Sequence, residues 1–245
     1  MPSCRRSSAK RRSVAPADPT RPSCLLALCL VVLLGGADAQ PPDWPWSAVG
    51  RVLVDGGGPC SGVLVAPALV LTVGHCVAGG RDWRARPLDR LRVALGGREH
   101  AVASVRLDTA SPFGPDGHPL DLSHDWALLG LAEPSLVPPV PYGGATAAWR
   151  AFATDEPLVK VGWQPLPGGF ASRLSDPDCR VAELGAAAHT LVYRCPDGAG
   201  PGRSGSALLL PAGEGWEVVA VQSAIGSPGG IVSGIAVVAE DGVVR

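Results

Sequence analysis

Residues 200–210 read GPGRSGSALLL, a glycine- and serine-rich turn that leads into a continuous apolar run. A short apolar run that follows turn residues is typical of a buried strand. Such a turn can present a serine hydroxyl on a tight loop, and Ser204 is the candidate nucleophile. Gly202 and Gly205 flank it, and glycine lets backbone N–H groups approach a substrate carbonyl, as an oxyanion hole requires. A plain Gly/Ser turn would have the same sequence, so this interpretation needs a base and an acid elsewhere.

The composition is that of a folded chain with many turns. Of its 245 residues, 46% are hydrophobic and 18% are charged, which allows a substantial core. The 32 glycines and 25 prolines favour short strands over long helices. The formal net charge is −1, and beyond the first residues the sequence has no basic stripe with interleaved aromatics. We therefore expect no nucleic-acid partner.

Residues 1–39 are predicted to be a signal peptide. A basic start at residues 5–12 precedes an apolar core at residues 24–34, and Ala37-Asp38-Ala39 forms a small-x-small cleavage site. The apolar core is short for a bilayer span, so an uncleaved anchor is the less favoured alternative. We expect a mature chain from Gln40 that is secreted or periplasmic and has no stable membrane insertion.

Four of the seven cysteines lie beyond the predicted signal peptide: Cys60, Cys76, Cys179 and Cys195. An even number in an exported chain indicates disulfides. Of the three possible pairings, the simplest joins Cys60 to Cys76 and Cys179 to Cys195, and each bond closes a loop of about fifteen residues. Zinc is the alternative, and it is disfavoured because no Cys-x-x-Cys or paired Cys/His spacing occurs.

Short apolar segments alternate with Gly and Pro through the rest of the chain, and Gly96-Gly97 is a hairpin signal. No segment has a sustained helical period, so we predict an all-β fold of two antiparallel barrels or sandwiches. The Pro-rich stretch SLVPPVPYGG lies in a predicted linker, residues 135–150, between halves at 40–134 and 151–245. Strands are expected near residues 50–54, 61–66, 69–72, 91–95, 101–107, 126–131, 158–162, 180–183, 191–195, 207–210, 218–222 and 231–238.

The first half supplies a candidate base and acid. Residues 69–77, LVLTVGHCV, place His75 at the end of an apolar run and beside Cys76. Imidazole can take a proton from a serine hydroxyl and return it to a leaving group. In DLSHDWALLGL, Asp125 precedes a second apolar run, where a carboxylate can accept the other imidazole N–H.

The segments LTVGHC, DWALL and GRSGSA resemble the three catalytic motifs of trypsin-like serine peptidases, in the order of the chymotrypsin fold. The resemblance spans roughly residues 49–238 and is nearest to the bacterial branch that includes the glutamyl endopeptidases. It implies two antiparallel six-stranded β-barrels with the active site between them. It also implies Ser204 as nucleophile, His75 as general base, Asp125 as its orienting partner, and an oxyanion hole formed by the N–H groups of Gly202 and Ser204.

The resemblance also assigns three substrate-binding positions, Gly198, Gln222 and Ser223. Gly198 stands where members that cleave after Lys or Arg carry a carboxylate, although Asp197 is adjacent and the register is open. Gln222 stands where the glutamyl endopeptidases have a histidine. Ser223 is expected to pair with the substrate backbone. The wall continues as Ala224-Ile225-Gly226, which suits a small or apolar side chain.

Two departures concern the surroundings of the triad. Val73-Gly74 replaces the usual alanine pair, and Arg203 replaces the aspartate that precedes the serine in the trypsin branch. No Ile-Val-Gly-Gly sequence precedes the first strand, so we expect activity without a new N-terminal ammonium. Cys179–Cys195 and Pro201 are the expected supports of the serine loop, with Arg203 either exposed or paired with a nearby acid.

The other histidines are expected to be peripheral. His124 neighbours Asp125 and is an alternative base, but a solvent-facing role is favoured. His100 and His118 are expected to be exposed. His118 and His124 are a poor metal pair at six residues apart on a loop, so no metal and no cofactor are predicted.

The leading hypothesis is an exported, monomeric serine endopeptidase that acts on protein or peptide substrates. One alternative is a catalytically weak member that binds peptides or partners, because this fold also serves as a binding module. Another is an esterase with the same triad. The order His, Asp, Ser argues against an α/β-hydrolase.

Overall fold

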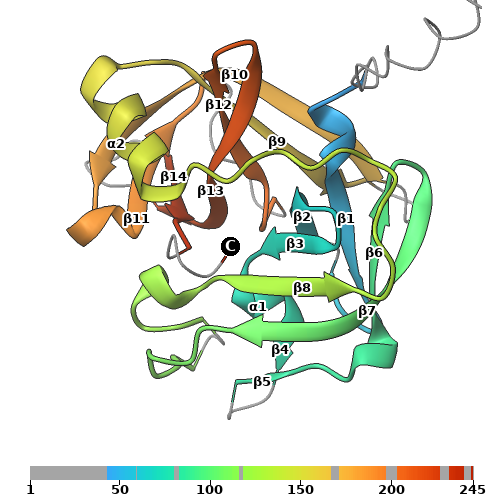
Figure 1. Ribbon diagram of the computed structural model, residues 1–245. Coiled ribbons are helices and arrows are strands. Elements are labelled where there is room, and N and C mark those ends of the chain that lie inside the picture. The colour runs from blue at the N-terminus through green and yellow to red at the C-terminus, as the bar shows by residue number, and fades with distance from the viewer. Residues whose placement is uncertain are drawn as a thin grey trace, which may run out of the picture. The chain divides into compact units, whose positions relative to one another are not determined.

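The computed structural model describes residues 43–58, 60–79, 83–115, 118–166, 171–196, 203–226, 232–239 and 244. The predicted signal peptide, Gly198, Pro201 and Gly202 lie outside these residues. Two closed antiparallel barrels of six strands each dominate the described part of the chain (Figure 1). The predicted all-β class and the two six-stranded barrels are therefore confirmed.

The strands of the first barrel follow one another in the hydrogen-bonded order β1, β2, β3, β8, β7, β6, with β6 pairing back to β1. Strand β2 is buried along nearly its whole length, which explains why its sequence does not alternate apolar with polar residues, although it includes Ser61. The bounds are β1 Val49–Val54, β2 Cys60–Ala66, β3 Leu69–Thr72, β6 Leu91–Leu95, β7 Arg98–Leu107 and β8 Ala127–Leu131.

The predicted hairpin at Gly96-Gly97 joins β6 to β7. The two glycines have φ of +54° and +81°, a region that favours glycine, and Leu95 pairs with Arg98 across the turn. Two consecutive residues at positive φ form the turn type that matches the twist of a two-residue hairpin.

The second barrel has the order β9, β10, β11, β14, β13, β12, and β12 pairs back to β9. Each of the twelve predicted strands corresponds to one barrel strand, although β10, predicted from Arg180 onward, begins at Ala171. The bounds are β9 Leu158–Pro165, β10 Ala171–Leu184, β11 Thr190–Arg194, β12 Ala207–Ala212, β13 Gly215–Gly226 and β14 Ser233–Val237.

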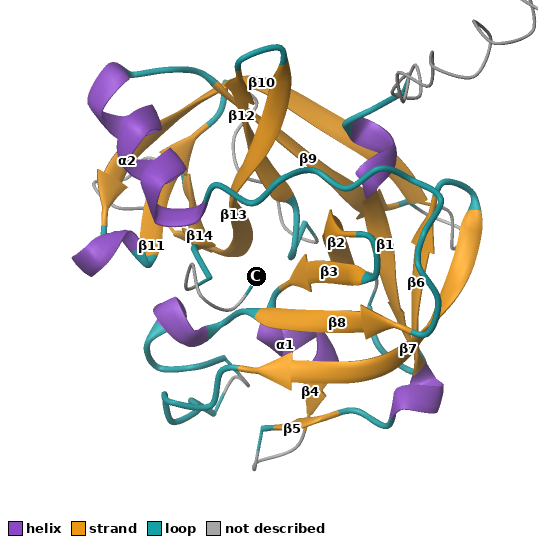
Figure 2. Cartoon of the chain, in the orientation of Figure 1, coloured by secondary structure: helices purple, strands orange, loops and turns teal. Residues whose placement is uncertain are grey.

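Helix α2 (Gly144–Thr154) corrects the expectation that the chain has no sustained helix, and it begins inside the predicted linker (Figure 2). Its buried residues are Gly144, Ala147, Ala148 and Ala151, and the helix packs on β10 and β13. Alanine is the best helix former but contrasts weakly with its neighbours in hydrophobicity, so the helical period is faint in the sequence. The shorter elements are α1 Gly74–Val77, β4 Ala78–Gly79, β5 Arg84–Ala85 and the 3-10 helices Trp46–Ala48, Leu88–Arg90, Leu122–His124 and Ala186–Ala188.

Residues of the two barrels contact each other directly. The Ser61 hydroxyl on β2 accepts a 2.8 Å hydrogen bond from the backbone N–H of Trp163 on β9, and the Trp163 indole donates to Val49 O at 2.9 Å. One cluster of buried apolar side chains includes residues from both barrels. None of the helices in the described part of the chain has both the length and the hydropathy that a membrane crossing requires.

Candidate active site

His75 lies on the single-turn helix α1, which follows strand β3 of the first barrel. A disulfide joins the next residue, Cys76, to Cys60 at the start of β2. The second disulfide joins Cys179 on β10 to Cys195, immediately after β11. These are the two pairs that the cysteine spacing predicts. The first bond ties the turn that carries His75 to the wall of the barrel.

His75 is paired with Asp125, which lies between the 3-10 helix Leu122–His124 and strand β8. The His75 Nδ1 atom lies 2.7 Å from Asp125 Oδ2, and the backbone N–H of His75 donates to Asp125 Oδ1 at 2.8 Å. The Asp125 side chain is completely buried, whereas that of His75 is 15% exposed. Because Nδ1 faces the carboxylate, Nε2 is the imidazole nitrogen that remains to exchange a proton.

Ser223, on β13 of the second barrel, donates a 2.5 Å hydrogen bond from its hydroxyl to Asp125 Oδ2. The buried carboxylate therefore receives three hydrogen bonds, which compensate for its removal from water. The sequence predicts that Ser223 contacts the substrate backbone. That contact stays a prediction. In the structure its side chain reaches the acid of the first barrel, a second contact that the sequence alone does not reveal.

Gly74, one of the two departures from the usual motif, lies in a crowded position. A Cβ atom on Gly74 would lie 2.9 Å from the Trp83 ring and 3.2 Å from Asp125 Oδ1. Trp83 is buried and stacks on Phe113 with ring centroids 3.6 Å apart. The tryptophan takes the space that an alanine methyl would fill, which gives glycine at this position a physical reason.

Ser204 lies in the turn before β12. Its carbonyl oxygen accepts a 2.8 Å hydrogen bond from Ser61 N, and the next N–H, of Gly205, donates to Gln222 O at 2.8 Å. Gly205 has φ of +79°, and a Cβ atom there would overlap Ser61 O. The serine turn is therefore pressed against β2 of the first barrel, which only glycine at position 205 permits.

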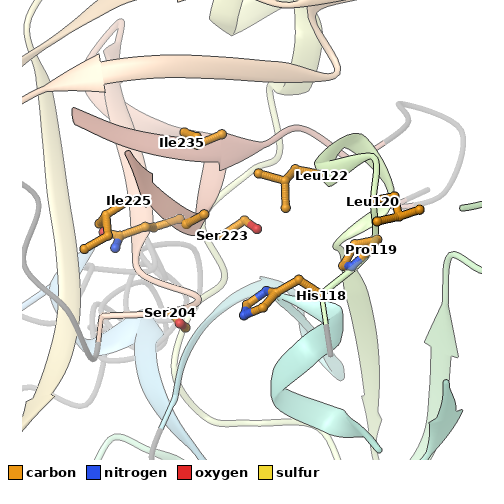
Figure 3. Close-up of a pocket in the computed structure, with 10 residues that line it drawn as sticks. His118, Pro119, Leu120, Leu122, Ser204, Ser223, Ile225 and Ile235 are labelled. Atoms are coloured by element: carbon orange, nitrogen blue, oxygen red, sulfur yellow. The ribbon is translucent and has the colours of Figure 1, made fainter. Parts of the chain in front are cut away.

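Ser204 lines a cavity of about 590 Å³ together with His118 (Figure 3). The His118 ring lies against the His75 ring, with centroids 4.4 Å apart, so the cavity adjoins the His75–Asp125 pair. The expectation that His118 is exposed is wrong, because its side chain is half-buried at this wall. The loop GPDGHP has no period from which this position could be inferred.

Most of the other residues that line the cavity are apolar, and Gln222 and Ser223 are the polar ones among them. The Gln222 side chain is buried, and its Oε1 accepts a 2.6 Å hydrogen bond from the Tyr193 hydroxyl. Burial, followed by the negative charge of Asp176, raises the pKa of Tyr193 well above its ordinary value. The described lining residues include no carboxylate: His118, Pro119, Leu120, Leu122, Ser204, Gln222, Ser223, Ala224, Ile225 and Ile235.

His124 is not solvent-facing as expected, because it is half-buried and its Nδ1 lies 2.8 Å from Asp108 Oδ2. This partner is distinct from Asp125, so the structure gives His124 no place in the pair. Nearby, hydrogen bonds from the side chain and backbone of Ser123 hold the pKa of Asp121 below its ordinary value. His100 is also half-buried, on β7.

Three potential metal ligands gather at the site. One donor atom each of His75, His118 and Asp125 lie within 4.8 Å of one another. Both oxygens of Asp125 already accept hydrogen bonds from the protein. The carboxylate is therefore already engaged by the protein, and we assign the group no metal.

Comparison with known proteins agrees with this fold. Human serine protease 56 is 30% identical over 144 residues, which cover 53% of this chain and 23% of that protein. Mouse chymotrypsin-C is 29% identical over 231 residues, 84% of this chain and 81% of that protein. The chain thus spans less than a quarter of the length of human serine protease 56 but most of chymotrypsin-C. A family model described as Trypsin matches residues 33–239, well over half of the chain. The chain belongs to the trypsin family.

Proposed function

We propose that the chain is an exported serine endopeptidase that hydrolyses peptide bonds through an acyl-enzyme. Ser204 is the nucleophile, His75 the general base and Asp125 the acid that orients His75. The observation that carries this proposal is the 2.7 Å contact between His75 Nδ1 and the fully buried Asp125 carboxylate. His75 lies beside the His118 ring, which shares a cavity with Ser204.

In the proposed reaction, Ser204 Oγ attacks the substrate carbonyl carbon while His75 Nε2 takes the hydroxyl proton. The fixed carboxylate of Asp125 stabilises the imidazolium that forms, and His75 then protonates the leaving amine. Water then attacks the acyl carbon while His75 Nε2 takes one of its protons, and His75 returns that proton to Ser204 Oγ as the acyl–oxygen bond breaks and the carboxylic acid leaves. The backbone N–H groups of Ser204 and Gly202 are assigned to the oxyanion, and Gly202 lies outside the described residues.

The apolar side chains in the cavity wall support a protein or peptide substrate with a small or apolar side chain near the scissile bond. Two disulfides support export, because cytosolic thiols are kept reduced. The proposed active form is the monomeric mature chain from Gln40. A place in the bacterial glutamyl endopeptidase-like branch stays an expectation, since the relatives reported above are mammalian and give it no support.

The test is labelling with a fluorophosphonate probe, which reacts with activated serines, followed by peptide mapping of the mature protein. We expect one labelled peptide that contains Ser204. Ser204→Ala should abolish labelling, and Ser175→Ala, which alters an exposed serine on β10, should preserve it. A folded wild-type protein that takes no label would favour the peptide-binding alternative. Labelling without peptide turnover but with ester turnover would favour the esterase.

A further inference from the structure

Arg203, the residue before Ser204, is held by side chains of the second barrel. Its Nη1 lies 2.6 Å from Asp176 Oδ2, and its Nη2 donates to Gln164 Oε1 at 3.3 Å. Lys160 Nζ lies 2.6 Å from the same Asp176 oxygen. One carboxylate therefore binds two cations, and one of these cations belongs to the loop of the candidate nucleophile.

The partners of Arg203 come from two adjacent strands of a closed barrel. Lys160 and Gln164 lie on β9, Asp176 lies on β10, and Asp176 is the direct cross-strand partner of Lys160. Because Lys160 and Asp176 are paired across two hydrogen-bonded strands, the barrel holds their side chains in fixed positions. Arg203 is the one member of the cluster that lies in a loop, so the pairing fastens the loop to the sheet.

Burial makes this attachment strong. The side chains of Lys160 and Asp176 are 2% and 7% exposed, and that of Arg203 is 14% exposed. Charges interact strongly away from water, and removal of one partner leaves the other uncompensated. Without Asp176, two cations would face each other in a largely buried site, and Arg203, which lies in the loop, would move away.

We infer that Asp176 is a positioning residue that captures the Arg203 guanidinium and thereby orders the loop that presents Ser204. The inference rests on the proposed role of Ser204 as nucleophile. It adds a further support for this loop to the expected ones: Cys179–Cys195 joins β10 to the end of β11, where the loop begins, and Pro201 lies outside the described residues. An N-terminal ammonium brought to this cluster would be a third cation, so the anchor replaces activation by a new N-terminus.

Hydrogen exchange measures loop order independently of catalysis. The peptide that contains residues 203–206 would be followed by mass spectrometry in wild type, Asp176→Asn, Arg203→Gln and Arg203→Lys. We expect Asp176→Asn and Arg203→Gln to raise its exchange rate at least tenfold, and Arg203→Lys to restore most of the protection. Asp43→Asn is the matched control, because it breaks an exposed two-bond ion pair with Arg173 on the same strand β10.

Labelling and turnover measurements then test whether order in this loop affects catalysis at Ser204. Fluorophosphonate labelling and kcat should fall at least tenfold in Asp176→Asn and Arg203→Gln, with a smaller change in KM. The double variant should be no worse than either single variant. Acetylation of the N-terminus of a chain that begins at Gln40 should leave activity unchanged.

Unchanged exchange of residues 203–206 in folded Asp176→Asn or Arg203→Gln would overturn the inference, as would additive kinetic losses in the double variant. If Asp176→Asn does not fold, the comparison of Arg203→Gln with Arg203→Lys decides the question. A wild-type protein whose Ser204 takes no label would refute the proposed function alone, because the exchange measurement tests the anchor without any turnover.

Discussion

The hydroxyl of Ser223 donates a 2.5 Å hydrogen bond to Asp125 Oδ2, although the two residues are 98 positions apart in the chain. The same oxygen lies 2.7 Å from His75 Nδ1. Ser223 lies on β13 of the second barrel, which also provides Ser204, whereas Asp125 and His75 belong to the first barrel. The barrel with the candidate nucleophile therefore also helps to fix the acid of the other barrel.

Ser223→Ala should slow catalysis without unfolding the protein. A hydrogen bond to a charged group contributes about 1.5–3 kcal/mol, so we expect kcat/KM to fall roughly 10- to 100-fold. The effect should appear mainly in kcat, because Asp125 would hold the imidazolium less well. The measurement is peptide turnover beside a thermal melt, with Ser175→Ala as control. Unchanged kcat in the folded variant would show that His75 alone orients Asp125.

Ser204→Ala and His75→Ala should each reduce kcat on the order of 10⁶-fold, and the double variant should lose no more than either single one. A serine hydroxyl is a weak nucleophile without its base, so the two side chains act as a unit. Casein or peptide turnover and circular dichroism measure activity and fold, and His100→Ala is the control. Activity near that of wild type in either folded variant would refute the triad.

Gly205→Ala and Gly213→Ala form a matched pair, because both glycines have positive φ, +79° and +58°. Alanine at such angles costs about 1–2 kcal/mol. A methyl group at Gly213 meets nothing within 4 Å, whereas one at Gly205 overlaps Ser61 O. Gly205→Ala should therefore lose an additional ~1–3 kcal/mol of unfolding free energy in urea, together with activity. Equal losses in the two variants would contradict the close packing of the serine turn on β2.

The proposed peptidase should prefer apolar side chains next to the cleaved bond and should not favour Lys or Arg. Leu122, Ile225 and Ile235 line the cavity, and the described part of its wall has no carboxylate. Ile225→Glu would introduce one at a position that is 44% exposed, where a charge stays solvated. We expect this variant to gain turnover of Lys and Arg substrates in a peptide library, with Val232→Glu, an exposed position outside the cavity wall, as control. A wild-type profile dominated by Lys or Arg would indicate that Asp197 lines the pocket.

Tyr193 should remain protonated in the folded protein at pH values where an exposed tyrosine ionises. Burial raises its pKa above the ordinary value of about 10, so below this value both folded and unfolded states hold the proton. At higher pH only the unfolded state releases the proton, so the free energy of unfolding should fall as pH rises. Absorbance at 295 nm of Tyr142→Phe, which leaves Tyr193 as the sole tyrosine, should rise only when the protein unfolds. Reversible ionisation near pH 10 in the folded state would contradict this.

The sequence by itself determined where the barrel strands lie, apart from the first half of β10, and it determined one hairpin turn. Strand β3 occupies the predicted residues 69–72, and Gly96-Gly97 forms the predicted hairpin. These features are local, because a short run of apolar residues is enough to predict a strand, and two adjacent glycines are enough to predict a hairpin turn. The order of the three motifs that contain His75, Asp125 and Ser204 can also be read directly from the sequence. Helix α2 escaped prediction because its buried residues are mostly alanine, whose small side chain gives little hydrophobic contrast.

Only the tertiary structure decided which distant polar groups meet. Asp125 with Ser223, Arg203 with Asp176 and His118 with His75 lie in separate segments, and no local pattern specifies their pairing. Closure of each barrel and the packing of one on the other set these contacts, because burial leaves each charge or hydroxyl only the partners that the strand register brings within reach. Asp176 and Ser223 therefore reach the loop of the candidate nucleophile and its acid only because the strands pair in a particular register, and no single segment of the sequence encodes that register.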